Sequence, residues 1–190
     1  MGDGVALNAF VFTANINTVT YLDVGNQSIS DLTGIEDFIA LDSLECSYNQ
    51  LTTLNVSNNS SLTYLKCDAN NIASIDLHNN TNLQILLTRI NKLTSLDVTE
   101  NLALTQLWCS GNQLTILDVS QNVSLNWLVC NDNELTSLDL RNGNNHNMYL
   151  WAEQNLNLSC INVDNASWAT SNWPVNLNIG PNHYFSENCP

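Results

Sequence analysis

The chain has 190 residues, of which 44% are hydrophobic and 12% are charged, and its formal net charge is −14. This length fits one domain with a full apolar core. The acidic balance argues against binding to nucleic acid or to anionic membranes, because both require patches of Lys and Arg. No apolar run is long enough to cross a bilayer, so we expect no insertion into a membrane.

The first residues, from Met1 to Gly4, lack the basic and apolar regions of a signal peptide. We therefore expect a segment cut from a longer exported protein. A less regular unit follows at residues 19–40. Its apolar side chains have nearly the same spacing as those of the regular units that come after it.

Five regular units then occupy residues 41–61, 62–82, 83–103, 104–124 and 125–145, and a variant unit with stretched spacing ends at residue 163. A repeat of this length predicts a solenoid, in which each coil buries its apolar face only by stacking on its neighbours. Each unit contains L-x-C/T-x-x-N or a close variant. The Asn of this phrase is expected to form a structural ladder that bonds buried backbone groups, and it recurs at Asn49, Asn70, Asn91, Asn112, Asn133 and Asn155.

Alternation within L-x-x-L-x-C predicts short parallel strands with the Leu and Cys side chains inward. Four cysteines share one inward position. Parallel strands would hold their Cβ atoms about 4.8 Å apart, which is too far for a good disulfide. We therefore expect buried thiols at Cys46, Cys67, Cys109 and Cys130.

Cys160 and Cys189 lie outside this column, in the terminal unit and the tail. A disulfide between them would tie the last coil to the tail and would indicate an oxidising location. Trp168, Trp173 and Tyr184 are then expected to pack as a lid over the end of the core.

A column of acidic residues points outward on the side away from the predicted sheet. Stacked carboxylates could bind calcium, or each could cap a local turn by accepting backbone N–H groups. This weak calcium candidate consists of Asp76, Asp97, Asp118 and Asp139; no other metal site is predicted. The three histidines are dispersed, and the sequence has no nucleophile elbow, phosphate loop or metal-binding helix motif. We expect no enzyme activity and no cofactor.

The outward strand positions have no core role, so their identities are informative. Aromatic residues gather toward the C-terminal coils and charged residues toward the N-terminal coils. Aromatic residues beside charges are typical of protein-binding surfaces, although aromatic residues also simply suit strands. The candidate ligand-binding residues on this face are Tyr64, Lys66, Arg89, Trp108, Trp127, Tyr149 and Trp151.

The repeats resemble leucine-rich repeats, and more narrowly those of exported cell-surface proteins of the Bacteroidetes (Flavobacteria-like). The matching phrases are ISDLTGIEDF (29–38), NQLTTLNVSNN (49–59), LDLRNGNN (138–145), NLNLSCINVDNASWATSNW (155–173) and FSENC (185–189). The resemblance implies a right-handed solenoid with a parallel β-sheet on its concave face and short 3-10 or irregular convex segments. It also implies three parts: a truncated N-terminal capping segment (1–18), repeats of 21–23 residues (19–163), and a C-terminal cap closed by the disulfide (164–190).

Three functions are compatible with these features. The first is a secreted or cell-surface recognition module that binds an extracellular protein through the concave face, as a monomer rather than an oligomer. The second is a carbohydrate-binding or adhesion module that uses the same aromatic residues on a polysaccharide. The third is a passive spacer.

Overall fold

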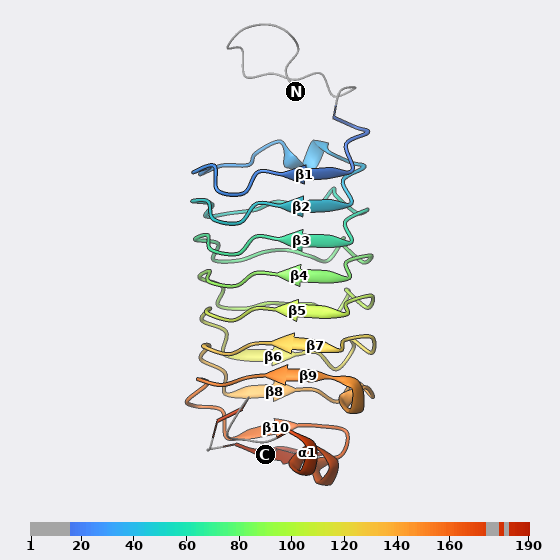
Figure 1. Cartoon of the computed structure of the whole chain (residues 1–190), viewed down its shortest axis with the longest axis vertical. Coiled ribbons are helices and arrows are strands. Elements are labelled where there is room, and N and C mark those ends of the chain that lie inside the picture. Colours follow the sequence, from blue (N-terminus) through green and yellow to red (C-terminus); the bar gives the residue numbers. More distant parts are fainter. Residues whose placement is uncertain (1–15, 174–178, 181–182) are drawn as a thin grey trace, which may run out of the picture.

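The computed structural model describes residues 16–173, 179–180 and 183–190, and shows a single stack of coils (Figure 1). The capping segment predicted at residues 1–18 lies almost wholly outside these residues. One strand from each coil joins a seven-stranded parallel sheet in the order β1-β2-β3-β4-β5-β7-β9. These strands are β1 (Tyr21–Asp23), β2 (Ser43–Glu45), β3 (Tyr64–Lys66), β4 (Ile85–Leu87), β5 (Gln106–Trp108), β7 (Trp127–Val129) and β9 (Tyr149–Trp151).

The register of this sheet follows the sequence repeat. Leu44 pairs with Leu65, and Leu107 with Leu128, so that each inward Leu stacks on its equivalent in the next coil. These side chains have no exposed surface, and the Cys side chains two residues further on are also buried. The inward positions predicted from the repeat are therefore confirmed, and the repeats form the leucine-rich-repeat type of solenoid.

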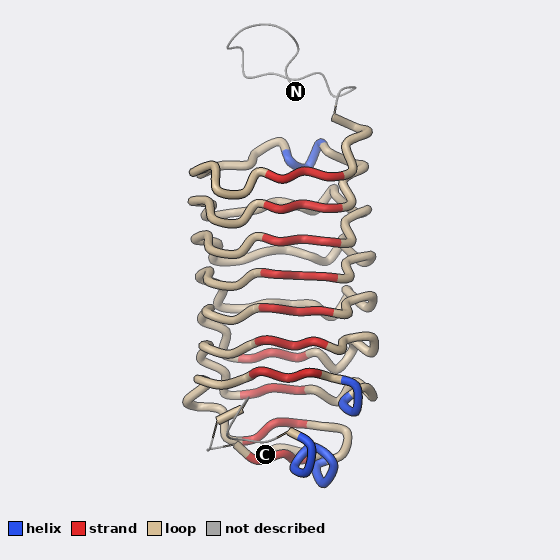
Figure 2. The backbone as a smooth tube through the Cα atoms, viewed as in Figure 1, coloured by secondary structure: helices blue, strands red, loops and turns tan. Residues whose placement is uncertain are grey.

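A second parallel sheet lies on the opposite side of the C-terminal coils and was not predicted. Its order is β11-β10-β8-β6, with β6 (Ile116–Asp118), β8 (Ser137–Asp139), β10 (Cys160–Asn162) and β11 (Tyr184–Ser186). The equivalent segments of the earlier coils are irregular loops (Figure 2). The helices in the described residues are short: η2 (Ile35–Asp37), η3 (Asn145–Asn147) and α1 (Ala166–Asn172).

An Asn ladder connects the coils where the chain leaves the main sheet. Asn112 is typical: its Oδ1 accepts from the backbone N–H of Leu93 at 3.0 Å, and its Nδ2 donates to the carbonyls of Thr88 at 2.9 Å and Cys109 at 3.0 Å. Leu93 and Thr88 belong to the preceding coil, and Cys109 belongs to the same coil as Asn112. Asn49, Asn70, Asn91, Asn133 and Asn155 make equivalent bonds, so the ladder fixes the register of every coil that carries it.

A second Asn column, at the opposite corner, only donates. Asn80 Nδ2 bonds the carbonyls of Val56 and Asn59, and Asn101 Nδ2 bonds those of Leu77 and Asn80. The Oδ1 atoms of these residues and of their equivalents are buried without a hydrogen-bond partner. This column thus ties each coil to the preceding one without closing a two-way ladder.

The C-terminal end of the core is covered by α1 and β11. The predicted disulfide between Cys160 and Cys189 is confirmed, and it closes a separation of 29 residues. Asn165 caps α1 by accepting from the backbone N–H of Trp168 at 2.8 Å. Trp173 is buried, and its indole Nε1 donates to the carbonyl of Met148.

One member of the predicted lid is wrong. Trp168 and Trp173 pack together edge to face with ring centroids 5.5 Å apart, and both lie against the core. Tyr184, however, is exposed, whereas its neighbour Phe185 is buried. The reason is that these residues form strand β11, in which adjacent side chains point to opposite faces.

Candidate functional site

The candidate site is the outward surface of the seven-stranded sheet, which we call the sheet face. Each coil contributes three outward positions: the first and third residues of its strand and the residue two positions beyond. The register aligns these positions into three columns. Tyr64 and Trp127 lie in the first column, Lys66 and Trp108 in the second, and Arg89 in the third.

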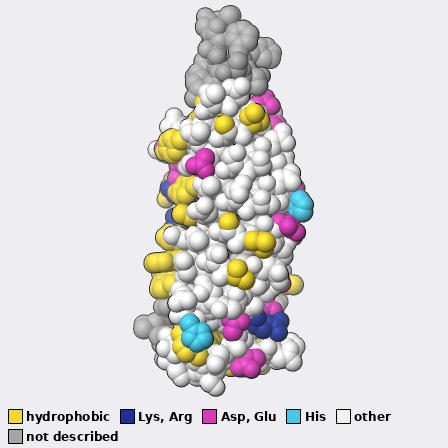
Figure 3. Space-filling model, turned by 90° about the vertical axis from the view of Figure 1, so that its right-hand side faces the viewer, with side chains coloured by type: hydrophobic (Ala, Val, Ile, Leu, Met, Phe, Trp, Pro, Cys, Tyr) yellow, Lys and Arg dark blue, Asp and Glu magenta, His cyan; other side chains and the backbone are white. Residues whose placement is uncertain are grey.

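The aromatic cluster consists of Trp108, Trp127, Tyr149 and Trp151, and it spans three adjacent strands. The ring centroids of Trp127 and Tyr149 are 4.7 Å apart, and those of Trp108 and Trp127 are 6.2 Å apart. Trp127, Tyr149 and Trp151 each expose about two fifths of their surface, from 39% to 40%. In Figure 3, the left margin shows hydrophobic side chains gathered beside basic ones, whereas the flank facing the viewer is mostly uncharged and polar.

The charged part of the sheet face consists of two ion pairs between neighbouring coils. Lys66 Nζ lies 2.6 Å from Glu45 Oε2, and Arg89 Nη2 lies 2.6 Å from Asp68 Oδ2. Hydrogen bonding to these carboxylates raises the pKa of Lys66 and of Arg89, so both remain charged at neutral pH. Asp68 is almost fully buried and also accepts from the backbone N–H of Arg89 at 2.7 Å. Arg89 is therefore held firmly in place.

Arg89 joins the charged and aromatic parts, which the sequence had suggested were separate. Its Cζ lies 4.7 Å from the centroid of the Trp108 ring, within the range of a cation–π interaction. The Nε1 of Trp108 is buried without a hydrogen-bond partner. Arg89 lies over the Trp108 ring and Trp127 packs beside it, so the rings of Trp127, Tyr149 and Trp151 are the more accessible part of the aromatic cluster.

Sequence reasoning missed a column of left-handed residues that borders the sheet face. Tyr48 and Ile90 have φ values of 56° and 55°, and both side chains are more than half exposed. A β-branched residue in this conformation is strained. With Asp68, Arg89 and Ser110, they line a hollow of about 230 Å³. The signal was the position just before each ladder Asn: two coils carry large apolar side chains there, whereas the other four carry small or polar residues, Ala69, Gly111, Asp132 and Gln154.

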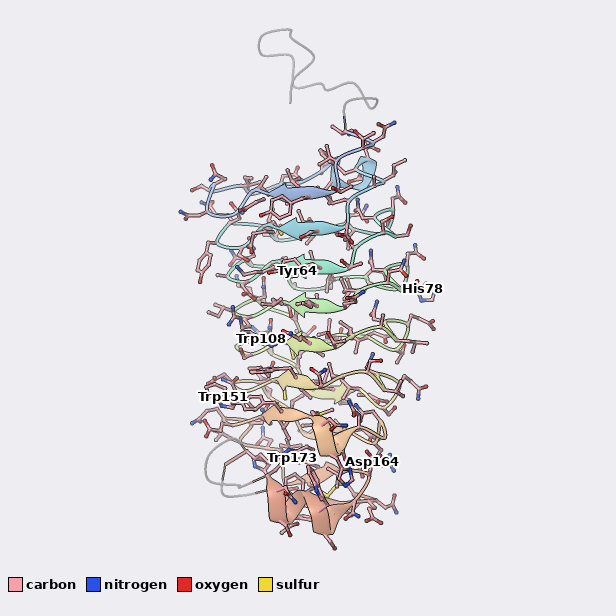
Figure 4. The ribbon with its side chains drawn as sticks, turned by 45° about the vertical axis from the view of Figure 1, so that its right-hand side comes forward. Tyr64, His78, Trp108, Trp151, Asp164 and Trp173 are labelled. Carbon is pink, nitrogen blue, oxygen red and sulfur yellow. A yellow bond between two sulfur atoms is a disulfide. The ribbon has the colours of Figure 1, made fainter. Side chains whose placement is uncertain are left out.

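The seven predicted ligand-binding residues all lie on the sheet face, although they are not equally available. Trp108 and Arg89 contact each other, while Tyr64 is half-buried on the neighbouring strand. Trp108 and Trp151 point to the same side of the stack in Figure 4, away from His78. Of these seven residues, Trp127, Tyr149 and Trp151 are the most exposed.

The acidic column on the opposite side makes local turns. The Oδ1 atoms of Asp76, Asp97, Asp118 and Asp139 each accept from the backbone N–H two residues later, at 2.8–3.1 Å. Hydrogen bonds from Thr99 lower the pKa of Asp97. Within the described residues, no three acidic, His or Cys side chains are grouped so as to hold a metal ion. These bonds match the turn-capping alternative for the column.

The four cysteines in the inward column are buried, and none of them forms a disulfide. Burial raises the pKa of the Cys46 and Cys109 thiols to about 12, and raises those of Cys67 and Cys130 well above their ordinary values. A thiolate is the reactive form of cysteine, so these side chains serve as core residues rather than nucleophiles.

The geometry defines a leucine-rich-repeat solenoid with exposed aromatic rings on its sheet face, and comparisons with known proteins agree with this fold. The chain is 51% identical over 43 residues to Internalin J of Listeria monocytogenes serotype 4b, a match that covers 23% of this chain and 5% of that protein. The solved functional domain of InlJ from Listeria monocytogenes, which includes a cysteine ladder, matches with a TM-score of 0.50 and 32% identity. That match covers 80% of this chain and 45% of the solved chain, so this chain spans less than half of either relative.

The leucine-rich repeat domain of APL1B is similar in fold alone, with a TM-score of 0.59 and 20% identity over 79% of this chain and 43% of that one. The chain matches no protein-family model. Among the described residues, no helix is long and apolar enough to cross a membrane.

Proposed function

We propose that this chain is a non-enzymatic extracellular recognition module that binds a protein partner through its sheet face. The observation that carries the proposal is the aromatic cluster. Three large rings on adjacent strands are each about two fifths exposed, beside an ordered ion pair and cation–π contact. Clustered Trp, Tyr and Arg side chains are the commonest energetic centres of protein interfaces, and solenoids present such surfaces along their length.

Several further features support an exported protein. The Cys160–Cys189 disulfide is typical of an oxidising compartment. The similarity to Internalin J and to the InlJ domain supports a surface or secreted role by analogy. An origin among the Bacteroidetes remains a prediction from the repeat phrases, and so does a monomeric state.

The test is site-specific photocrosslinking on intact cells or on extracellular-matrix proteins. A photoreactive phenylalanine replaces Trp127 on the sheet face, and a matched variant carries it at Ile116, which is 61% exposed on the second sheet. We expect discrete protein adducts from position 127 and none from position 116. Equal labelling from both positions, or labelling that Trp151→Ala leaves unchanged, would refute recognition through the sheet face.

A second candidate, binding to a polysaccharide, is favoured by the same exposed rings, because tryptophan and tyrosine faces can stack on sugars. A glycan array separates the two. Glycan binding that is lost in both Trp127→Ala and Trp151→Ala, with no protein adducts, would favour the carbohydrate function. If the chain binds neither proteins nor glycans, the remaining function is that of a passive spacer.

A further inference from the structure

The basic residues of the sheet face are neutralised internally, whereas the carboxylates beside the exposed rings are not. Lys66 is paired with Glu45 and Arg89 with Asp68. At the C-terminal end, Glu153 Oε2 accepts only a neutral hydrogen bond, from the Trp151 indole Nε1 at 3.2 Å. Asp132 accepts a hydrogen bond from the Asn131 side chain. No ion pair among the described residues involves Glu153 or Asp132.

These carboxylates belong to the two coils that carry the exposed rings of the aromatic cluster. Glu153 occupies the third outward column, two residues after Trp151, and Asp132 lies in the left-handed turn of the preceding coil. The backbone N–H of Asp132 donates to the carbonyl of Glu153 at 2.9 Å, which holds the two turns side by side. The Trp151 indole thus bonds one carboxylate, Glu153, and a second carboxylate, Asp132, lies in the adjoining turn of the preceding coil.

Elsewhere on the sheet face, a ring beside a carboxylate already has a cation from the chain itself. In the third column, Arg89 reaches over Trp108 of the next coil, and a carboxylate from the preceding coil, Asp68, fixes the guanidinium. The residue that stands in the same relation to Trp151 is Asn131, which is neutral and too short to cover the ring. The face of Trp151 therefore has the ring and nearby carboxylates, on this coil and the preceding one, but no cation of its own.

We propose that the protein partner inserts a cationic side chain, Arg or Lys, over Trp151 and between Glu153 and Asp132. This inference rests on the proposed recognition function and names the chemistry of the partner. A cation there gains both the attraction of the ring face and that of the carboxylates. The net charge of −14 adds long-range attraction for a basic partner segment. The rest of the cluster, Trp127 and Tyr149, would contact the apolar stem of the same side chain.

The probe is the short peptide acetyl-Gly-Arg-Gly-Arg-Gly-amide, titrated into isotope-labelled protein while the indole N–H signal of Trp151 is followed by NMR. The control peptide replaces both Arg residues with citrulline, which has a similar shape but no charge. We expect a saturable shift at Trp151 with the Arg peptide only. A shift of equal size with citrulline would overturn the proposal, because charge would then have no role.

Two protein variants and one matched control locate the effect. Glu153→Gln should weaken binding roughly fivefold, as expected for losing an exposed ion pair beside a ring. Asn131→Arg should place an internal cation over Trp151 and abolish the shift. Glu100→Gln removes the same charge from the opposite side, where Glu100 is exposed, and should change nothing. If Glu100→Gln weakens binding as much as Glu153→Gln, the attraction is non-specific and the proposed site is wrong.

The outcome is separable from that of the recognition function. If the photocrosslinks at position 127 persist in both Glu153→Gln and Asn131→Arg, the proposal of protein binding through the sheet face stands and the proposal of a cationic partner side chain is refuted. Loss of those crosslinks in both variants, with retention in Glu100→Gln, would support both.

Discussion

Replacing one ladder Asn in the middle of the stack tests the physical basis of the scaffold. In Asn112→Ala, the backbone N–H of Leu93 loses its hydrogen-bond acceptor, and it has no other acceptor in the structure. The carbonyls of Thr88 and Cys109 lose one donor each, but each keeps a second donor, from Asn91 and Asn133 respectively. The substitution thus leaves one buried donor without an acceptor and removes one of two donors from each of these two carbonyls. It also removes a long bond of 3.5 Å to the carbonyl of Ser110, which keeps the backbone N–H of Ile90 as its donor.

The expected loss of stability follows from these bonds. A buried unsatisfied N–H costs about 1–3 kcal/mol, and each lost bond to a carbonyl that keeps another partner costs about 0.5–1 kcal/mol. Asn112→Ala should therefore lower the free energy of unfolding by about 2–5 kcal/mol. Urea unfolding followed by circular dichroism measures this change, provided that the m-value is unchanged.

The matched control is Asn82→Ala. Asn82 is exposed, and its side chain makes one bond, from Nδ2 to the carbonyl of Ser60 at 3.1 Å. Its loss should cost below about 0.5 kcal/mol, as is usual for a surface substitution. If Asn112→Ala and Asn82→Ala have the same small effect, the ladder does not stabilise the coils as argued. Asn112→Asp refines the test, because it keeps the acceptor for Leu93 but loses the donors and buries a charge.

Three further predictions concern the core, the strained turn and the cap. The Cys109 thiol has a pKa of about 12 when folded against an ordinary value of 9.0, so the folded chain keeps a proton that the unfolded chain loses, and stability should fall as pH rises above 9. In urea unfolding at about pH 10.5, Cys109→Ala should reduce this loss by about 2 kcal/mol; an unchanged pH dependence would contradict the burial argument. Ile90→Asn should raise the thermal midpoint by relieving about 1 kcal/mol of left-handed strain, whereas Ile116→Asn, on an exposed strand position, should not. Reduction of the Cys160–Cys189 disulfide should cost about 3–4 kcal/mol in denaturant unfolding, since it closes a 29-residue separation; no change would show that the cap is held by packing alone.

The sequence was sufficient for the scaffold because one period governs every inward position. Leu44, Leu65 and Leu107 recur at the repeat interval, and their burial follows from strand alternation once the solenoid is inferred. The same logic distinguished Cys160 and Cys189 from the thiols of the core column. Strand alternation and the repeat interval, applied to each coil in turn, are therefore enough to predict the register of the sheet.

The second sheet could not be predicted in this way. The segments Ile116–Asp118 and Ser137–Asp139 are strands, yet nearly the same residues in earlier coils form irregular loops. Whether such a segment pairs depends on how closely successive coils approach on that side. In the last coils, β10 and β11 extend the pairing and provide hydrogen-bond partners that the earlier coils lack.

The details of the candidate site depended on contacts between coils at positions where the repeat varies. Nothing in the spacing of Asp68, Arg89 and Trp108 indicates that one carboxylate fixes a guanidinium over the next ring, because all three positions are merely outward. The consequence is functional. Since Arg89 neutralises Asp68 and lies over Trp108, the middle coils of the sheet face have little unmet charge or accessible ring surface, although Tyr21 on β1 is exposed. The same columns two coils later place Asn131 where a cation would lie, so Trp151 and Glu153 remain available, and the binding energy of a partner should be concentrated there.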